Sequence, residues 1–269
     1  MRPLGSALAL ALAACAVCSG AARGDDGDYA PVPQDLASTR LLDLPSPVPL
    51  GRHVFEVSFT HRFAEPFQDG SGHDLWGLDG GADVGLGFAF GLSDAFDLSL
   101  YRTSYAETFE VAGRFAFFRQ APRVPFSVAL RAGADVSGQR EVDERTRPFA
   151  QLLLARRFGR GWNLIVAPSW VRDTPRLRNA FNAPVGITCP FLGDSLLVAE
   201  YIPRNRDLEA SVAAWSVGWS KAVGLHVFEI SLGNARATTV DQMLGGDFAA
   251  GFASGDVRLG FNLIRKFKH

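Results

Sequence analysis

The sequence predicts an all-β fold, an up-and-down antiparallel transmembrane β-barrel of about 12 strands. Apolar and polar residues alternate along most of the chain from Val54 onward. Single charged residues stand on the less apolar face of these segments, and the connections between the segments alternate in length. A soluble sandwich would share the alternation, but its dry core would have to neutralise every inward charge, whereas a wet lumen does not.

Period-two alternation defines the strands in order along the chain. In residues 54–63, Phe55, Val57 and Phe59 share one face, whereas Glu56 and Ser58 share the other. The pattern is equally clear in residues 82–90, 109–117, 126–135, 214–220 and 256–263. It is weaker in residues 96–102, 149–158, 162–171, 185–191, 196–201 and 225–232, which complete the set. An even number of strands brings both ends of a single-chain barrel to the same side of the membrane.

The connections between these segments alternate between short and long. The short ones are residues 91–95, 119–125, 159–161, 193–194 and 221–224. The longer, more polar ones are residues 64–81, 137–146, 173–182, 203–211 and 233–255, and only residues 103–107 break the rule. Aromatic residues such as Trp162, Trp170 and Trp215 fall near strand ends on the apolar face. Both features are typical of outer-membrane barrels.

The polar face of the strands predicts the lining of the lumen. We expect eight charged residues to point inward: Glu56, Asp83, Arg114, Arg131, Asp135, Glu200, Glu229 and Arg258. Glu56 on the first strand and Arg258 on the last are expected to be neighbours where the barrel closes. The charged groups either close the barrel through salt-bridge networks or line a narrow polar pore. Open porins need roughly 16–18 strands, so closure by side chains is the expectation.

Residues 1–24 are predicted to be a cleavable export signal. Arg2 precedes a small-apolar stretch from Leu4 to Val17, and acidic residues follow at Asp25 and Asp26. The stretch is shorter than the roughly 20 residues that a membrane-spanning helix needs. Residues 12–15 also fit a lipobox, so lipidation of Cys15 is an alternative route.

Residues 25–51 form an irregular segment between the signal and the barrel, which is predicted over residues 52–269. The segment is rich in Pro and Asp, and its main apolar part is Leu41, Leu42 and Leu44. It either trails in the periplasm or plugs the lumen. As a plug, it would bring Arg40 to an inward carboxylate such as Glu56 or Glu229.

The sequence offers little support for cofactor or catalytic chemistry. The formal net charge of −1 indicates no nucleic-acid partner, and the five histidines lack metal-ligand spacing, so we expect no metal and no cofactor. His61 is expected to face lipid near the outer rim as an interfacial residue. The chain has no G-x-S-x-G motif and no serine matched to His61, so we expect no enzyme, with an outer-membrane lipid hydrolase as the alternative.

Residues 77–83, 199–204, 226–232 and 255–262 together resemble an uncharacterised family of bacterial outer-membrane β-barrels, known only as a domain of unknown function. The resemblance implies a barrel and brings no substrate and no catalytic residues. The alternating C-terminal residues up to Phe267 look like the terminal strand signal of outer-membrane proteins. We therefore expect a Gram-negative outer-membrane location, with outer-membrane lipid, lipopolysaccharide and the barrel assembly machinery as partners. The expected role is a porin-like narrow channel or transporter for small solutes, or a structural or interaction barrel without transport.

Overall fold

The computed structural model describes residues 38–67, 69–73, 75–139, 145–159, 161–174, 179–205, 212–245 and 256–268. The predicted export signal and Cys15 lie outside the described residues. Among these residues, no helix is long and apolar enough to cross a bilayer.

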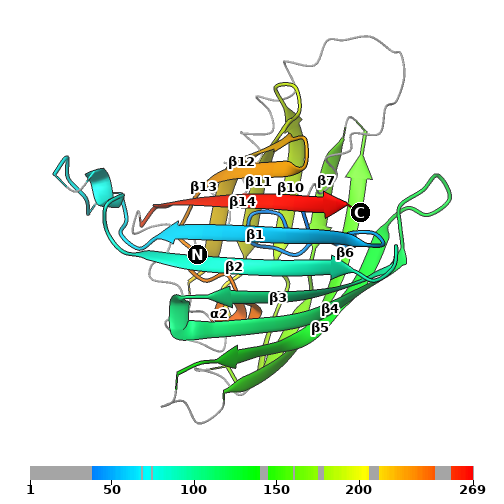
Figure 1. Cartoon of the computed structure of the whole chain (residues 1–269), viewed down its shortest axis with the longest axis horizontal. Coiled ribbons are helices and arrows are strands. Elements are labelled where there is room, and N and C mark those ends of the chain that lie inside the picture. Colours follow the sequence, from blue (N-terminus) through cyan, green and yellow to red (C-terminus); the bar gives the residue numbers. More distant parts are fainter. Residues whose placement is uncertain are drawn as a thin grey trace.

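The described residues form one closed sheet of antiparallel strands (Figure 1). Neighbours in the chain pair with each other around the ring, and the last strand pairs with the first to close it. The strands are β1 (Val54–Phe63), β2 (Ala82–Gly91), β3 (Phe96–Thr103), β4 (Thr108–Phe118), β5 (Ser127–Ser137), β6 (Thr146–Phe158), β7 (Trp162–Val166), β8 (Ser169–Arg172), β9 (Asn179–Asn182), β10 (Val185–Phe191), β11 (Ser195–Ile202), β12 (Ala214–Val223), β13 (His226–Gly233) and β14 (Arg258–Lys268).

Two of the strands that cross the barrel are interrupted by proline. Pro168 separates β7 from β8, which both pair with β6, and Pro184 separates β9 from β10. Proline has no N–H to donate to the ladder, but its carbonyl still accepts, so Leu152 N bonds Pro168 O and Ala167 N bonds Pro184 O. Counted with these interruptions, the described residues form a closed barrel of twelve strands, and the predicted fold is confirmed.

The two faces of each strand differ as period-two alternation predicts. In β2, the side chains of Leu86, Phe88 and Phe90 are exposed on the outside, whereas Asp83 and Ala89 are buried inside. The outer face carries large apolar side chains, which is the composition that a surface in contact with lipid requires. The inner face carries polar and small residues, and these shape the lumen.

The short turns lie at one end of the barrel together with the start of β1 and the end of β14. The long connections lie at the other end, and one of them contains the 3-10 helix η1 (Leu75–Gly77). The short connection between β3 and β4 also lies there and contains the 3-10 helix η2 (Tyr105–Glu107). One sequence-based assignment is wrong here, because residues 179–182 form β9 and not part of a loop. Its four residues end just before Pro184, too short a segment for alternation to reveal.

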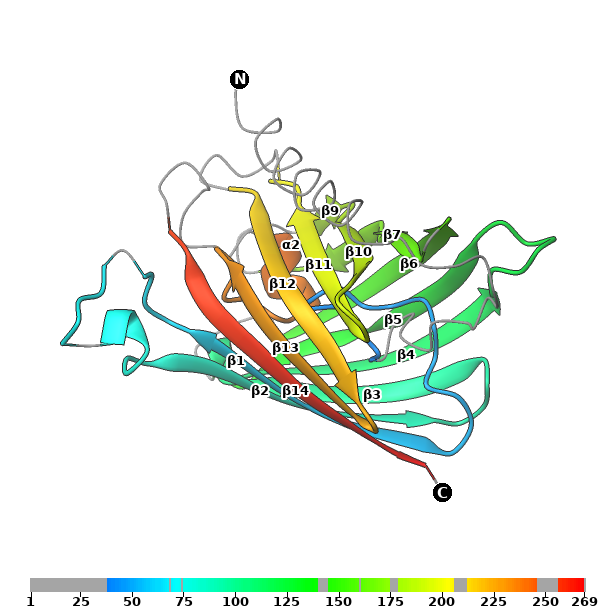
Figure 2. The ribbon, with the colours of Figure 1, turned by 90° about the horizontal axis from the view of Figure 1, so that it is seen from above.

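Two segments outside the strands fill the inside of the ring (Figure 2). One comprises residues 38–48, which we call the hairpin. The other, which we call the loop insert, comprises residues 234–245 between β13 and β14 and contains the short helix α2 (Val240–Gly245). All six residues of α2 are buried.

Candidate functional site

The candidate site is the lumen of the barrel. The structure places all eight predicted charged residues on the inner face, each no more than 8% exposed: Glu56, Asp83, Arg114, Arg131, Asp135, Glu200, Glu229 and Arg258. Other inward charges that the sequence did not single out join them: Arg62, Asp97, Glu110 and Arg147. The inner wall of the barrel is therefore charged. Whether a passage runs through the barrel depends on what these charged side chains contact.

The hairpin folds back on itself inside the lumen. Ser46 N donates to Thr39 O at 3.0 Å, and Leu41 N donates to Leu44 O at 2.7 Å, which closes a tight tip at residues 41–44. The tip leucines have almost no exposed surface. Leu41 and Leu42 belong to one apolar cluster with Ala155, Ile165 and Val198 of the wall.

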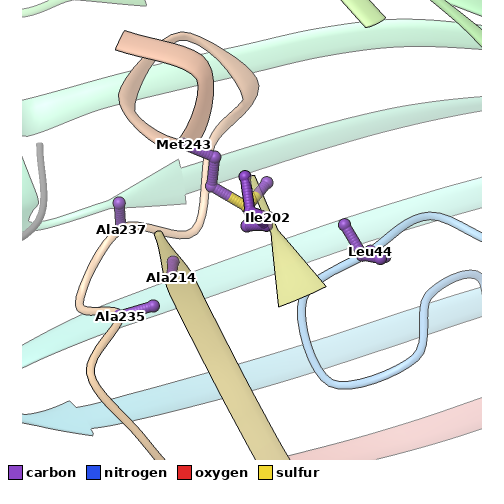
Figure 3. Packing of buried hydrophobic residues seen from close by; sticks show 6 residues of the cluster. All are labelled: Leu44, Ile202, Ala214, Ala235, Ala237 and Met243. Atoms are coloured by element: carbon purple, nitrogen blue, oxygen red, sulfur yellow. The ribbon is translucent and has the colours of Figure 1, made fainter. Parts of the chain in front are cut away.

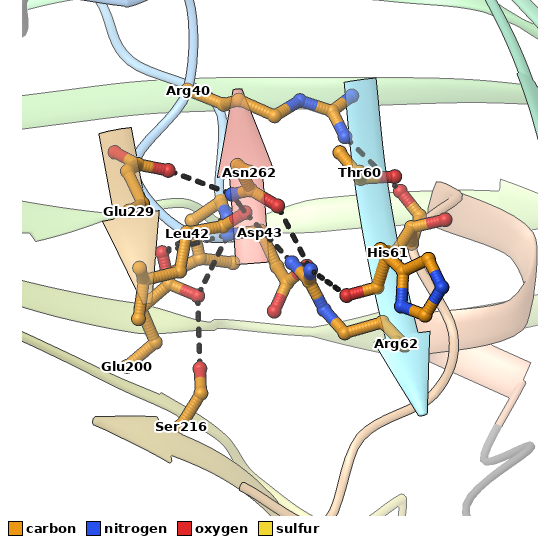
Figure 4. A network of polar contacts seen from close by, with 12 residues as sticks. Arg40, Leu42, Asp43, Thr60, His61, Arg62, Glu200, Ser216, Glu229 and Asn262 are labelled. Carbon is orange, nitrogen blue, oxygen red and sulfur yellow. Dashed lines mark hydrogen bonds and ion pairs between the residues drawn. The ribbon is translucent and has the colours of Figure 1, made fainter. Parts of the chain in front are cut away.

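The tip of the hairpin is held by polar side chains of three strands (Figure 4). Arg62 of β1 forms an ion pair with Asp43 at 2.7 Å and also donates to Leu42 O at 3.2 Å. Asn262 of β14 donates to the same carbonyl at 2.9 Å. The Glu200 carboxylate of β11 accepts from the backbone N–H groups of Asp43 and Leu44 at 3.1–3.2 Å. Charged partners make these hydrogen bonds stronger than neutral ones.

The base of the hairpin is held by a second polar group. Arg114 donates to Thr39 O at 2.9 Å and to Ser46 O at 2.7 Å, so one guanidinium clamps both arms. The same Arg114 pairs with Asp97. The Glu56 carboxylate accepts from the Thr39 hydroxyl and backbone N–H. Both arms of the hairpin base are thus bound to the wall through their backbone.

The loop insert is anchored to another part of the wall. Asp241 forms an ion pair with Arg147 of β6 at 2.6 Å, and Asp135 of β5 accepts from the Asp241 backbone N–H at 2.8 Å. Glu110 of β4 accepts from Val240 N at 3.1 Å. Val240 and Leu244 pack in one cluster with apolar residues of β4, β6, β8 and β9: Ala112, Phe149, Val171 and Ala180.

The two inserts meet in the lumen (Figure 3). Leu44 of the hairpin lies in one apolar cluster with Ala237 and Met243 of the loop insert and with Ile202 and Ala214 of the wall. The polar cavity beside the hairpin has a volume of about 30 Å³. A volume of this size holds about one water molecule. Among the described residues, the hairpin and the loop insert thus occupy the space inside the ring.

One expected pairing within the lumen is wrong, and another has a different partner. Glu56 does not meet Arg258, because antiparallel pairing of β1 with β14 places Glu56 opposite Lys266. Arg258 lies near the other end of β14, where it bonds Asp256 and Ala64 O. Arg40 does reach an inward carboxylate, as expected for a plug, but the partner is Glu110 at 3.6 Å and not Glu56 or Glu229. Its guanidinium also stacks over the ring of Tyr101.

The structure also bears on the metal and histidine expectations. Within the described ranges, no group of three or more His, Cys, Asp or Glu residues has the arrangement of a metal site. His61 faces outward, where its ring stacks on Phe261 at 4.8 Å and lies 4.5 Å from the Phe63 ring. Its environment is the aromatic outer surface of β1 and β14.

No curated protein matches the chain in sequence. Among solved structures, outer membrane phospholipase A from Escherichia coli is similar, with 12% identity and a TM-score of 0.45 over 90% of this chain and 94% of that one. The Salmonella typhi outer membrane phospholipase dimer with bound calcium has 13% identity and a TM-score of 0.45, covering 81% and 91%. LpxR from Salmonella typhimurium has 13% identity and a TM-score of 0.36, covering 80% and 100%.

These structures correct one expectation from the sequence. We expected the chain not to be an enzyme, and that exclusion is wrong, because the solved structures similar to it include outer membrane phospholipase A, an enzyme by name. The lack of a G-x-S-x-G motif does not exclude an enzyme, because such motifs do not transfer between folds. The likeness itself is too distant to assign an activity.

The family comparison covers most of the chain and the whole described barrel. A model described as "Membrane bound beta barrel domain (DUF5777)" matches residues 36–267. This match includes the hairpin, all strands and the loop insert, and it confirms the resemblance that the sequence segments indicate. The chain belongs to this family of membrane-bound β-barrel domains.

Proposed function

We propose that this protein is an outer-membrane channel for small polar solutes that is closed at rest by its own hairpin. The observation that carries the proposal is the charged inner wall, several of whose groups bind the hairpin or the loop insert. Arg62, Arg114 and Glu200 each bind a backbone group of the hairpin. Water could take the place of those backbone groups once the hairpin leaves.

A barrel that only had to stay closed would gain little from such a wall. Replacing a buried ion pair by well-packed apolar residues of similar volume is often neutral or stabilising. Buried charges are therefore a costly way to fill a lumen permanently. The same charges are suited to a surface that is wet in a second state, because water then solvates them at no packing cost.

The hairpin and the loop insert share β4, where Arg114 binds the base of the hairpin and Glu110 meets both Arg40 and Val240 N, but their other anchors lie on different strands. The polar anchors of α2 lie on β4, β5 and β6. The tip of the hairpin is anchored on β1, β11 and β14. Departure of the hairpin alone therefore uncovers one side of the lumen while the loop insert stays in place. The passage left would be narrow and lined by charged and amide side chains, which favours small polar solutes.

Planar-bilayer recording tests the proposal. Refolded wild-type protein is expected to show no steady conductance, and a variant lacking residues 38–48 is expected to show defined channels. Arg258→Gln is the matched control, because Arg258 is an inward arginine whose hydrogen bonds do not involve the hairpin. A deletion variant that folds, shown by its heat-modifiable migration in gels, but never conducts would favour a structural or interaction barrel without transport.

The finer location is also a proposal. We infer that the chain is exported in a Gram-negative bacterium through the signal in residues 1–24 and is inserted into the outer membrane by the barrel assembly machinery. There it would contact outer-membrane lipid and lipopolysaccharide. The signal-like composition of residues 1–24 and the apolar outer face of the strands support this. Intact-mass analysis of membrane-extracted protein should find a start between Cys15 and Asp25, and a diacylglycerol increment on Cys15 would select the lipoprotein route. Retention of Met1 would contradict export with cleavage.

A further inference from the structure

The wall holds the tip of the hairpin in the way that a binding site holds a peptide. Arg62 donates to the Asp43 carboxylate, and Arg62 and Asn262 both donate to the Leu42 carbonyl. Glu200 accepts from the backbone N–H groups of Asp43 and Leu44, and Ser216 donates to Glu200 at 3.3 Å. Side chains of the wall therefore meet both the acidic side chain and the main chain of the tip (Figure 4).

Apolar pockets lie beside these polar contacts. A Cβ atom at Gly218 would lie 2.9 Å from a methyl carbon of Leu42, so the absence of a side chain on β12 makes room for that leucine. A Cβ atom at Gly186 of β10 would lie 3.0 Å from Leu41 and 3.4 Å from Leu44. Leu44 fills the cluster that Ile202, Ala214 and Met243 border. The wall is thus complementary to an acidic residue with aliphatic residues around it.

We infer that this part of the lumen is a binding site for short peptides that carry an acidic residue between aliphatic residues, and that the hairpin occupies it as an internal ligand. The inference rests on the proposed function, because a ligand from outside needs the hairpin to leave. It goes further by naming the solute: the channel admits or senses peptides that compete with residues 41–44.

The polar groups select a peptide over a simple anion. A small anion would bring no N–H donors for the oxygens of Glu200, and a neutral amide would leave the buried Arg62 without a carboxylate partner. A ligand must therefore bring a carboxylate for Arg62 and N–H groups for Glu200 in one molecule. A free amino acid meets both requirements but leaves the flanking apolar pockets empty, so a peptide of three or more residues fits better.

Calorimetric titration with a synthetic peptide tests the inference. The probe is the acetylated and amidated peptide of residues 40–46, and the matched probe carries Asp43→Asn. The receptors are full-length Asp43→Arg, in which the hairpin is expelled by Arg62, and the variant lacking residues 38–48. The probe should bind both receptors and should not bind the wild type, whose site is filled. Asp43→Asn in the probe, or Arg62→Gln in the receptor lacking residues 38–48, should weaken binding at least about tenfold, since each removes a charge-assisted hydrogen bond. Arg258→Gln should leave binding unchanged.

The outcomes separate this inference from the proposed function. Peptide binding without conductance would refute the channel and keep the binding site. Conductance without peptide binding to either folded receptor would refute the binding site and keep the channel. Equal binding of the two probes would overturn the inference as well, and so would equal effects of Arg62→Gln and Arg258→Gln on peptide binding. Either result would mean that the peptide is not recognised by its contact with Arg62.

Discussion

Replacing Arg62 or Asp43 alone should release the hairpin from the lumen, whereas replacing both should leave it in place. The two groups lie 2.7 Å apart, with side-chain exposures of 4% and 3%. Removing one partner of a buried pair leaves the other charge buried and uncompensated, at a cost of about 3–5 kcal/mol. Replacing both by apolar residues of similar size removes the charge problem, so the double variant should be close to the wild type.

The two single variants should differ within that range. In Asp43→Leu, Arg62 keeps its hydrogen bonds to Leu42 O and to Asn262 Oδ1, so the cost should fall near the lower limit. In Arg62→Met, the Asp43 carboxylate stays beside the Glu200 carboxylate that accepts from its backbone N–H, so the cost should fall near the upper limit. Since the barrel ladder does not depend on the hairpin, this energy should appear as hairpin release and not as unfolding of the barrel.

Cysteine labelling measures this release. Ser46 is fully buried, so Ser46→Cys, in a background without other cysteines, should react with a maleimide only when the hairpin leaves. At about 1.4 kcal/mol for each tenfold change, a cost of 3–5 kcal/mol raises the open fraction roughly 100-fold to several-thousand-fold. Single variants that label no faster than the wild type would refute this reasoning. A double variant that labels as fast as the singles would do the same, because it would show that the pair is not coupled.

Three further changes test other parts of the structure. Phe261→Arg on the lipid face should lower the free energy of unfolding in vesicles by about 2–4 kcal/mol, far more than Phe261→Leu. If urea titrations give equal losses for the two variants, the face of Phe261 is assigned wrongly. Asp241→Asn should leave Arg147 buried without its carboxylate and raise labelling of a Met243→Cys probe by about 100-fold, and unchanged labelling would show that this pair does not anchor α2. Gly186→Val should push Leu41 out of its pocket without changing any charge, and Ser46→Cys labelling that stays at the wild-type rate would contradict the packing described for the hairpin.

The strands and their facing could be predicted because both depend on local alternation. A lipid-facing strand needs an apolar residue at every second position. The sequence alone shows this pattern in β2, β4 and β14. The broken strand β9–β10 was only half predicted. Its first part has four residues before Pro184, which is too few for a period to emerge.

The partners within the lumen could not be predicted in the same way. The register between strands and the tilt of the strands determine which inward charged residues come into contact. Neither property can be inferred from the sequence of a single strand. This is why Glu56 was matched to Arg258, although the ladder places it beside Lys266. The loop insert carried one usable signal. Val240, Met243 and Leu244 have the spacing of one apolar helix face, inside a connection that the overall polarity of residues 233–255 predicts to be a loop.

The most direct test of the central claim is single-channel recording of full-length Asp43→Arg beside the variant that lacks residues 38–48. If the hairpin is the closure, a charge that expels it should create openings of the same unit conductance as its deletion, while the wild type and Arg258→Gln stay closed. The result that would contradict the account is an Asp43→Arg protein in which Ser46→Cys labels rapidly, so that the hairpin has left, and yet no channel appears.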